Sequence, residues 1–282
     1  MTTSAPTPPA LRDIHGPSAL GGGFQRFCYL AWVMAATDFK LGYFGSALGY
    51  LWSLVRPLLL FGVLYLVFSQ VIRLGEGVPN YPVLLLLNIV LFTFFTEASQ
   101  NAVQSVVRRE NLVRKMHFPR VTVPLAAVLT SALNLVVNLV AVFVFILAYG
   151  VNPRPSWLLF PVIVLVLATF TFGVSLILAA LFPRFRDVEP IWAITGTILF
   201  YGSPVLYPIE LVPDDWQWVV LANPVAALLE TARVAVVDPT APSVAEAAGA
   251  LAWVTPMVVF VAVCVVGLWV FNREAPRIAE EL

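Results

Sequence analysis

The chain has 282 residues, of which 60% are hydrophobic and only 11% are charged. Soluble domains are about 45–50% apolar and about 25% charged, so this composition excludes an ordinary soluble domain and favours a membrane protein. The formal net charge is zero, which leaves nucleic-acid binding without electrostatic support.

The N-terminal residues 1–23 are rich in Pro, Ser, Thr and Gly. They cannot bury enough apolar surface to order themselves, and we expect a flexible cytoplasmic tail. In residues 24–40, by contrast, apolar side chains recur on one helical face, while Tyr29 and Trp32 suit a headgroup interface. This pattern predicts an amphipathic helix lying on the membrane. The apolar face comprises Phe24, Phe27, Ala31, Met34 and Ala35.

The alternative for residues 24–40 is that they begin the first membrane span early. Three glycines, Gly42, Gly45 and Gly49, favour a break between the amphipathic helix and that span.

Six apolar runs follow within residues 41–272. A transmembrane helix needs about 20 mostly apolar residues, which matches the length of these runs. Because every backbone polar group must be satisfied internally in hydrocarbon, we expect the runs to be helices. The predicted fold class is therefore an all-α integral membrane protein with six transmembrane helices. The runs cover residues 47–72, 81–99, 121–149, 157–182, 191–211 and 250–271.

The distribution of positive charge predicts how these helices are oriented. With the N-terminus placed inside, twelve Lys and Arg residues fall on inside segments and three fall on outside segments. An excess of this kind is typical of cytoplasmic loops. We therefore expect both termini to be cytoplasmic, including a C-terminal tail at residues 273–282.

Two charged residues stand out inside the predicted spans, where charges are rare and are functional hypotheses by default. Arg56 lies about nine residues into the first span, and Glu97 lies about seven residues before the inside end of the second. At about 1.5 Å per residue these depths are similar, so the two side chains could form an ion pair. Alternatively, Arg56 could contact an anionic group of a substrate or extend to the inside interface.

Further polar features lie in and before the third span. The inside loop at residues 104–120 is the most charged inside segment, and its charges alternate with apolar residues. This pattern predicts a short helix that ends near Pro119. Asn134 and Asn138, four residues apart on the third span, predict a polar stripe that packs against other helices.

The longest outside segment lies between the fifth and sixth spans. Its apolar pieces, at residues 205–211 and 219–229, are too short to cross a bilayer, and each is broken by proline. Such pieces are typical of re-entrant or interfacial segments.

Four aromatic residues of this outer region allow two interpretations. Trp216 and Trp218 favour an aromatic belt at the level of the headgroups. Tyr201 and Tyr207 flank Ser203-Pro204, where a helix must break, and they could instead offer a stacking surface for sugar rings near a pore exit.

The chain carries no recognised catalytic or metal-binding motif. It lacks the phosphate-loop pattern GxxxxGK[ST], and its two lysines, Lys40 and Lys115, follow no glycine-rich turn. HExxH, GxSxG and Cys/His clusters are also missing, and Cys28 and Cys264 are interpreted as small apolar residues. We therefore expect a protein that is not an enzyme, binds no metal or cofactor, and cannot hydrolyse ATP by itself.

Several segments, in the same order along the chain, resemble the motifs of one family. YFGSALGYLWSLVRPLL is similar to its S-x-LG-x-x-W…P pattern, and ENLVRKMHFPRVTVPLA to its N-L-[IV]-[RK]-K-x-x-FP-R segment. LFPRFRDVEPIW resembles its F-x-RD motif, and SPVLYPIELVP followed by LANPVAALLE resembles its S-P-x-[FLW]-Y-P…NP motif. The family is that of the permease subunits of type-2 ABC exporters that move polysaccharides such as O-antigen and teichoic acid.

The resemblance implies a permease of the bacterial cytoplasmic (inner) membrane that dimerises with itself around a central channel. A separate cytoplasmic ATPase subunit would use ATP and Mg to drive export of a lipid-linked glycan or cell-wall polymer. The amphipathic helix at 24–40 would be an interface helix, and residues 203–230 would contain re-entrant gate helices.

The same resemblance, together with the charges and tyrosines described above, gives three groups of expected site residues. The first group couples to the ATPase, the second forms a substrate entrance and hinge, and the third lines the translocation path. They are, in that order, Glu110, Asn111, Leu112, Arg114, Lys115, His117, Phe118 and Arg120; Leu48, Gly49, Trp52 and Arg56; and Glu97, Tyr201 and Tyr207.

Two other functions stay open on the sequence alone. The first is a drug or lipid exporter of the same superfamily, which neighbouring resistance genes rather than glycosyltransferase genes would indicate. The second is a membrane-bound transferase acting on lipid-linked sugars, which needs a carboxylate or histidine cluster at one membrane face. Asp214 and Asp215 form the only adjacent pair of outside carboxylates, and an exposed loop explains them more simply.

Overall fold

The computed structural model describes residues 23–43, 49–73, 77–110, 119–249 and 252–281. Throughout these residues the regular structure is helical, as the composition and the apolar runs predict. The predicted N-terminal tail, apart from Gly23, and the middle of the predicted coupling loop lie outside the described residues.

Five helices are long and apolar enough to cross a bilayer, and a sixth candidate arises only if a bent helix pair counts as one span. Five of the six predicted runs are thus confirmed. The five helices are α2 (Gly49–Tyr65), which continues as the π-helix η1 (Leu66–Val71); α3 (Tyr81–Val103); α6 (Thr122–Ala148); α7 (Phe160–Leu181), which follows the 3₁₀ turn η2 (Pro155–Leu159); and α12 (Val254–Glu281).

The predicted fifth run, residues 191–211, is not one helix. It contains α8 (Val188–Gly202), which has 15 residues and therefore rises about 22 Å, short of the hydrocarbon core of about 30 Å. The helix stops at Ser203, whose backbone is extended, because a residue that precedes a proline is disfavoured in the helical conformation. The residues that follow continue as irregular chain, in which Val205 and Leu206 are buried.

The chain between α8 and α12 forms a compact set of short helices. α9 and the continuous pair of α10 and η4 meet at a bend of 104°, with Pro224 at the start of α10. The helices are the 3₁₀ turn η3 (Ile209–Leu211), α9 (Asp214–Leu221), α10 (Pro224–Ala232), the π-helix η4 (Arg233–Val237) and α11 (Val244–Ala248).

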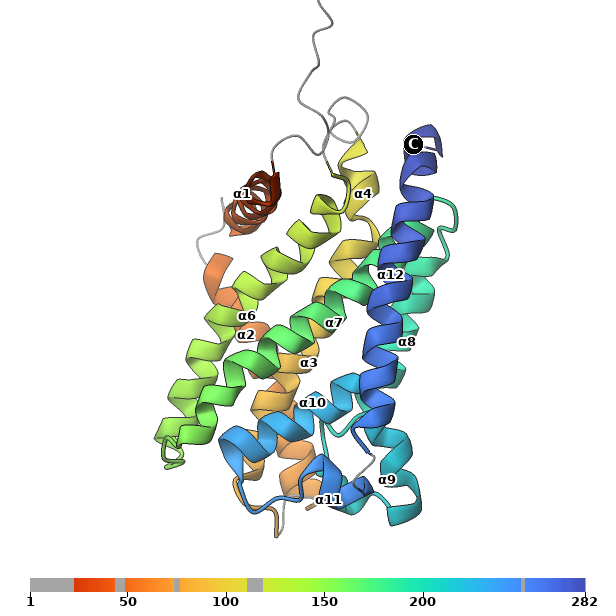
Figure 1. Ribbon diagram of the computed structural model, residues 1–282. Helices are drawn as coiled ribbons and strands as arrows, with labels where there is room; N and C mark the ends of the chain where they lie inside the picture. The colour runs from red at the N-terminus through yellow and green to blue at the C-terminus, as the bar shows by residue number, and fades with distance from the viewer. Residues whose placement is uncertain (1–22, 44–48, 74–76, 111–118, 250–251, 282) are drawn as a thin grey trace, which may run out of the picture.

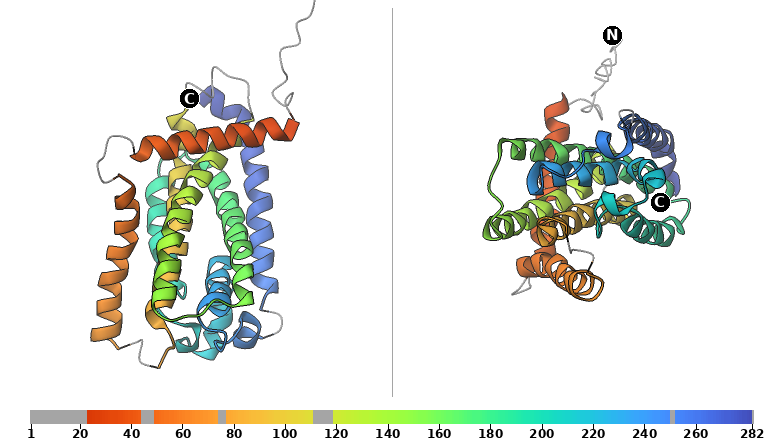
Figure 2. Two further views of the ribbon diagram at one scale, coloured as in Figure 1. Left: turned by 90° about the vertical axis from the view of Figure 1, so that its left-hand side faces the viewer. Right: turned by 90° about the horizontal axis from the view of Figure 1, so that it is seen from below.

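The spans stand side by side around α3, which is the most buried of them. α3 packs against α6 and α7, and α12 packs along α7 (Figure 1). Helix α1 (Gly23–Tyr43) lies crosswise over one end of the bundle, the end at which the C-terminus also lies (Figure 2). The short helices α9, α10 and α11 gather at the opposite end.

Helix α1 includes the residues predicted to form a separate amphipathic helix. Ala31 and Ala35 on its apolar face are fully buried, and the helix packs against α6. Asp38 near its end forms an ion pair with Arg109, which follows the short helix α4 (Ser105–Arg108). The helix passes through Gly42, so the predicted break does not begin at that glycine.

Helices α7 and α12 approach each other closely at two glycines. A Cβ atom added to Gly267 would lie 2.4 Å from the carbonyl oxygen of Gly173. A Cβ atom added to Gly173 would lie 3.1 Å from Cys264. Small residues of this kind let helix backbones pack tightly in membranes, and here they fix α12 onto the bundle.

Candidate functional site

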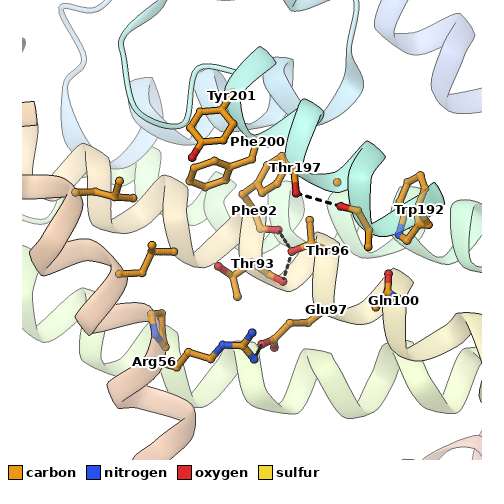
Figure 3. Close-up of a pocket in the computed structure, with 15 residues that line it drawn as sticks. Arg56, Phe92, Thr93, Thr96, Glu97, Gln100, Trp192, Thr197, Phe200 and Tyr201 are labelled. Carbon is orange, nitrogen blue, oxygen red and sulfur yellow. Dashed lines mark hydrogen bonds and ion pairs between the residues drawn. The ribbon is translucent and has the colours of Figure 1, made fainter. Parts of the chain in front are cut away.

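An open cavity of about 420 Å³ lies between α2, α3 and α8, and we call it the groove (Figure 3). Its wall on α2 carries one charged residue, its wall on α3 carries most of the polar side chains, and its wall on α8 is aromatic. The groove is lined by Arg56, Pro57, Leu60, Leu64, Phe92, Thr93, Thr96, Glu97, Gln100, Trp192, Ala193, Gly196, Thr197, Phe200 and Tyr201.

Arg56 and Glu97, the two charges predicted at similar depths, meet across the groove. The Nη1 atom of Arg56 lies 3.3 Å from Oε1 of Glu97. The Arg56 side chain is 80% exposed and the Glu97 side chain 35% exposed. Most of the Arg56 guanidinium therefore faces the open side of the groove. There its remaining N–H groups can donate hydrogen bonds to a ligand.

The ion pair predicts a measurable coupling between the two positions. Replacing Arg56 and Glu97 with alanine, singly and together, should give a coupling free energy of about 0.5–1 kcal/mol, because the pair is largely exposed. Chemical unfolding of the purified variants in detergent measures it. The charge-swapped variant, Arg56→Glu with Glu97→Arg, should be more stable than either reversed single variant. Additive effects of the two alanines would contradict the contact.

Three aromatic rings, spread from the second turn of α8 to its end, line the α8 side of the groove. Trp192 donates from Nε1 to the Ser99 hydroxyl at 2.9 Å. Phe200 makes an edge-on contact with Phe92 of α3 at 5.3 Å between ring centroids. Tyr201 is 61% exposed at the end of the helix. Trp192 and Phe200 thus hold the aromatic wall against α3, whereas the ring of Tyr201 is open to its surroundings.

Sequence reasoning found Tyr201 but missed Trp192, Phe200 and Phe92. Aromatic residues inside an apolar span are ordinary lipid-facing or packing residues, so they gave no signal individually. A signal was present in their spacing, because Trp192, Gly196 and Phe200 recur every four residues and so share one face of α8.

Tyr207 lies beside the groove and is not among its lining residues. Its half-buried ring packs against the main apolar core, and its hydroxyl donates to the carbonyl oxygen of Tyr201 at 3.2 Å. Burial raises the pKa of the Tyr207 hydroxyl, which therefore stays protonated and able to donate at neutral pH. Tyr207 supports the end of α8, and Tyr201 is the ring that reaches the groove.

The irregular chain after α8 is anchored by polar side chains, three of which the sequence reasoning did not single out. Asn88 of α3 donates from Nδ2 to the Pro204 carbonyl oxygen at 2.9 Å, and the Tyr81 hydroxyl donates to the Leu206 carbonyl oxygen at 2.7 Å. Asn223 donates to the Ser203 hydroxyl at 3.0 Å. The bonds from Asn88 and Tyr81 satisfy backbone carbonyl groups that a helix would have satisfied internally.

A largely buried cluster of three charged residues connects the short helices between α8 and α12. Arg233 binds both oxygens of Glu210, at 2.7 and 2.8 Å, and also Oε1 of Glu230 at 2.6 Å. The side chains of Arg233 and Glu230 are 3% and 0% exposed, whereas Glu210 is partly open to solvent. The cluster joins η3 to the junction of α10 and η4.

Asn134 and Asn138 take the place expected of a polar stripe. They line a small polar cavity between α2, α3 and α6, together with Ser53, Ser131 and Glu97. Asn138 donates to the Asn134 carbonyl oxygen at 2.9 Å within α6. The cavity places uncharged polar groups behind the Arg56–Glu97 pair.

The expected coupling and hinge residues are described only in part. Glu110 and Arg120 are half-buried, and they flank the rest of the group, which lies outside the described residues: Asn111, Leu112, Arg114, Lys115, His117 and Phe118. Leu48 also lies outside them, Gly49 begins α2, and Trp52 is exposed.

The helices and the groove define a multi-pass membrane protein with a charged and aromatic groove along one side of its bundle. Residues 29–237 match the family of ABC-2 type transporters. The chain is 31% identical over 254 residues to the O-antigen export system permease protein RfbA of Klebsiella pneumoniae, which covers 89% of this chain and 93% of that protein.

Two further relatives carry related names. The O-antigen export system permease protein RfbA of Myxococcus xanthus is 30% identical over 251 residues, or 87% of this chain and 92% of that protein. The polysialic acid transport protein KpsM of Escherichia coli is 22% identical over 190 residues, or 67% of this chain and 74% of that protein. This chain belongs to the ABC-2 type transporter family. Because that family consists of transport permeases, the transferase alternative is set aside.

Proposed function

We propose that this chain is the membrane subunit of an exporter that moves a lipid-linked polysaccharide across the bacterial cytoplasmic membrane. The names of its relatives support polysaccharide as the cargo. The observation that carries the proposal is the groove, which combines an exposed cation with an aromatic wall. Aromatic faces suit the apolar faces of sugar rings, and a guanidinium suits the phosphate of a lipid carrier.

A second copy of the chain would close the groove into a channel. A guanidinium that is 80% exposed at the depth of the membrane is costly against lipid and belongs in a protein or water-filled setting. The two helices that flank the groove also present apolar faces that are open in a single copy. These faces carry Leu59 and Val63 on α2 and Ile194 and Ile198 on α8. A symmetric dimer would cover these faces and enclose both copies of Arg56.

The remaining roles follow the orientation that the positive charges favour. The end with α1 and the C-terminus is cytoplasmic in this proposal, and the loop at residues 104–120 contacts a separate ATPase subunit there. That subunit binds ATP and Mg, and this chain binds no cofactor of its own. Helix α1 acts as the interface helix, and the bent pair of α9 and α10 acts as the re-entrant outer gate.

The proposal is tested in the native host by deleting the gene and measuring polysaccharide on the cell surface. The deletion should abolish surface polymer while lipid-linked polymer accumulates inside, and the wild-type gene should restore export. The tagged protein should purify with an ATPase subunit. Normal surface polymer in the deletion strain, with loss of resistance to a drug, would instead identify a drug exporter.

The aromatic wall predicts a graded response at Tyr201. Phenylalanine keeps the stacking face and should retain export, whereas leucine keeps bulk without a ring and alanine removes both. With about 1 kcal/mol per ring contact, alanine should lower the rate of export roughly fivefold. Surface polymer is measured in complemented cells, and ATPase co-purification shows that assembly is intact. Trp216→Ala on the exposed face of α9 is the matched control, with no loss expected. Equal export for all three Tyr201 variants would mean that the ring does not touch the cargo.

A further inference from the structure

A third cavity, separate from the groove, lies where α7 ends beside α12. Its volume is about 130 Å³, and we call it the basic pocket. It lies at the end of the bundle where α1 crosses and the C-terminus emerges, which is the edge of the membrane-crossing part of these helices. It is lined by Ala180, Leu181, Arg184, Phe185, Trp269, Val270, Arg273 and Glu274.

Two guanidinium groups reach the basic pocket from different elements. Arg184 comes from the turn after α7, and its Cζ atom lies 5.4 Å from the centroid of the Phe185 ring. Arg273 comes from α12, and its Cζ atom lies 5.3 Å from the centroid of the Trp269 ring. Neither arginine makes an ion pair with an acid in the part of the chain that the structure describes. Stacking on a ring orients the guanidinium plane and leaves its edge of N–H donors available.

The net charge of the basic pocket is positive. Two arginines line it against one acid, Glu274. Arg186, in the same turn, stacks on Phe182 at 4.9 Å and adds a third cation nearby. A planar fork of N–H donors from each arginine matches the oxygens of a phosphate group.

The surface next to the pocket is apolar and suits acyl chains. α12 presents an exposed row of aliphatic side chains that runs from the pocket toward the middle of the bundle. Trp269, at the mouth of the pocket, is 58% exposed, as is typical of tryptophan at the headgroup level. The row consists of Val258, Val261, Val265 and Leu268.

We propose that the basic pocket binds the phosphate of an anionic phospholipid, with Arg184 and Arg273 as its ligands and the acyl chains along α12. Basic pockets between transmembrane helices bind acidic lipid headgroups in this way. A free phosphate ion would satisfy the two arginines but would leave the row on α12 without a function. Because α8 begins at Val188, directly after the turn that carries Arg184 and Arg186, a bound lipid also holds the first turn of the groove-lining helix.

Native mass spectrometry of the purified protein tests the proposal by counting retained lipids after incubation with phosphatidylglycerol or phosphatidylcholine. The wild type should retain phosphatidylglycerol preferentially. The variant Arg184→Gln with Arg273→Gln should lose about tenfold or more of that affinity. The matched control, Arg26→Gln with Lys40→Gln, removes two exposed cations of α1 at the same end and should bind phosphatidylglycerol as the wild type does.

Three results would overturn the proposal. The first is an equal loss in the control variant, which would indicate general surface charge. The second is equal retention of phosphatidylcholine, and the third is displacement of the lipid by millimolar inorganic phosphate, which would indicate a site for the free ion. Should the double variant fail to fold, Arg184→Gln and Arg273→Gln are measured singly. A loss confined to phosphatidylglycerol then supports the site, and no loss in either variant refutes it.

Discussion

Replacing Gly267 with alanine is expected to destabilise the protein by about 1–3 kcal/mol, the usual range for overpacking a tightly packed site. The new Cβ atom would lie 2.4 Å from the carbonyl oxygen of Gly173, far inside an ordinary contact. The neighbour is backbone and cannot rotate away, so α12 must move off α7. Thermal unfolding of the purified variant in detergent, followed by size-exclusion chromatography, measures the loss.

Gly62→Ala is the control for this substitution. Gly62 also lies within a membrane helix, but nothing lies within 4 Å of a Cβ atom added there. Alanine is a better helix former than glycine, so this variant should be as stable as the wild type or about 0.5–1 kcal/mol more stable. If Gly267→Ala behaved in the same way, the close approach of α7 and α12 would be wrong.

Replacing Arg233 with methionine should cost about 3–5 kcal/mol, because it leaves a buried carboxylate without its partner. Glu230 is fully buried and accepts a hydrogen bond from Arg233, whereas Glu210 is partly exposed and can be solvated. The substitution also cuts the connection between η3 and the end of α10. Unfolding of the purified variant and its export activity are both measured, and both should fall.

Two companion variants separate the charge from the shape of this cluster. Glu230→Gln keeps an acceptor for Arg233 and should change stability by only about 1 kcal/mol. Arg233→Met combined with Glu230→Leu replaces the buried charges with apolar side chains and should recover most of the stability lost in Arg233→Met. A double variant no more stable than Arg233→Met would mean that the cluster acts through packing rather than through charge.

The spans were predictable because every segment that crosses a bilayer must be a long and mostly apolar helix. Hydropathy alone located α2, α3, α6, α7 and α12, and the fixed rise of a helix put Arg56 and Glu97 at similar depths. The same rule failed for residues 203–209. They are mostly apolar and largely buried in protein, and apolar residues buried in protein and in lipid look alike in a sequence.

The contacts of the site were less predictable than its charges. The i,i+3 spacing of Glu230 and Arg233 is visible in the sequence, but Glu210, which completes their cluster, lies 20 residues before Glu230 and meets them only through the turn between α9 and α10. The anchors Tyr81 and Asn88 likewise act on chain more than 100 residues away. Hydrogen bonds and ion pairs between residues so far apart in the chain depend on how the helices pack. No pattern of neighbouring residues in a single sequence indicates them.

The anchoring of the chain after α8 has a consequence for how the protein is made. α8 is short for a membrane helix, and the buried chain that follows it relies on Asn88 and Tyr81 of α3 for its hydrogen-bond partners. Because α3 precedes α8 in the chain, α3 is synthesised first, and we expect α8 to become stable in the bilayer once it docks on α3. The chain after α8 thus depends on α3 for its folding, and we expect a defect in α3 to leave α8 open to membrane quality-control proteases.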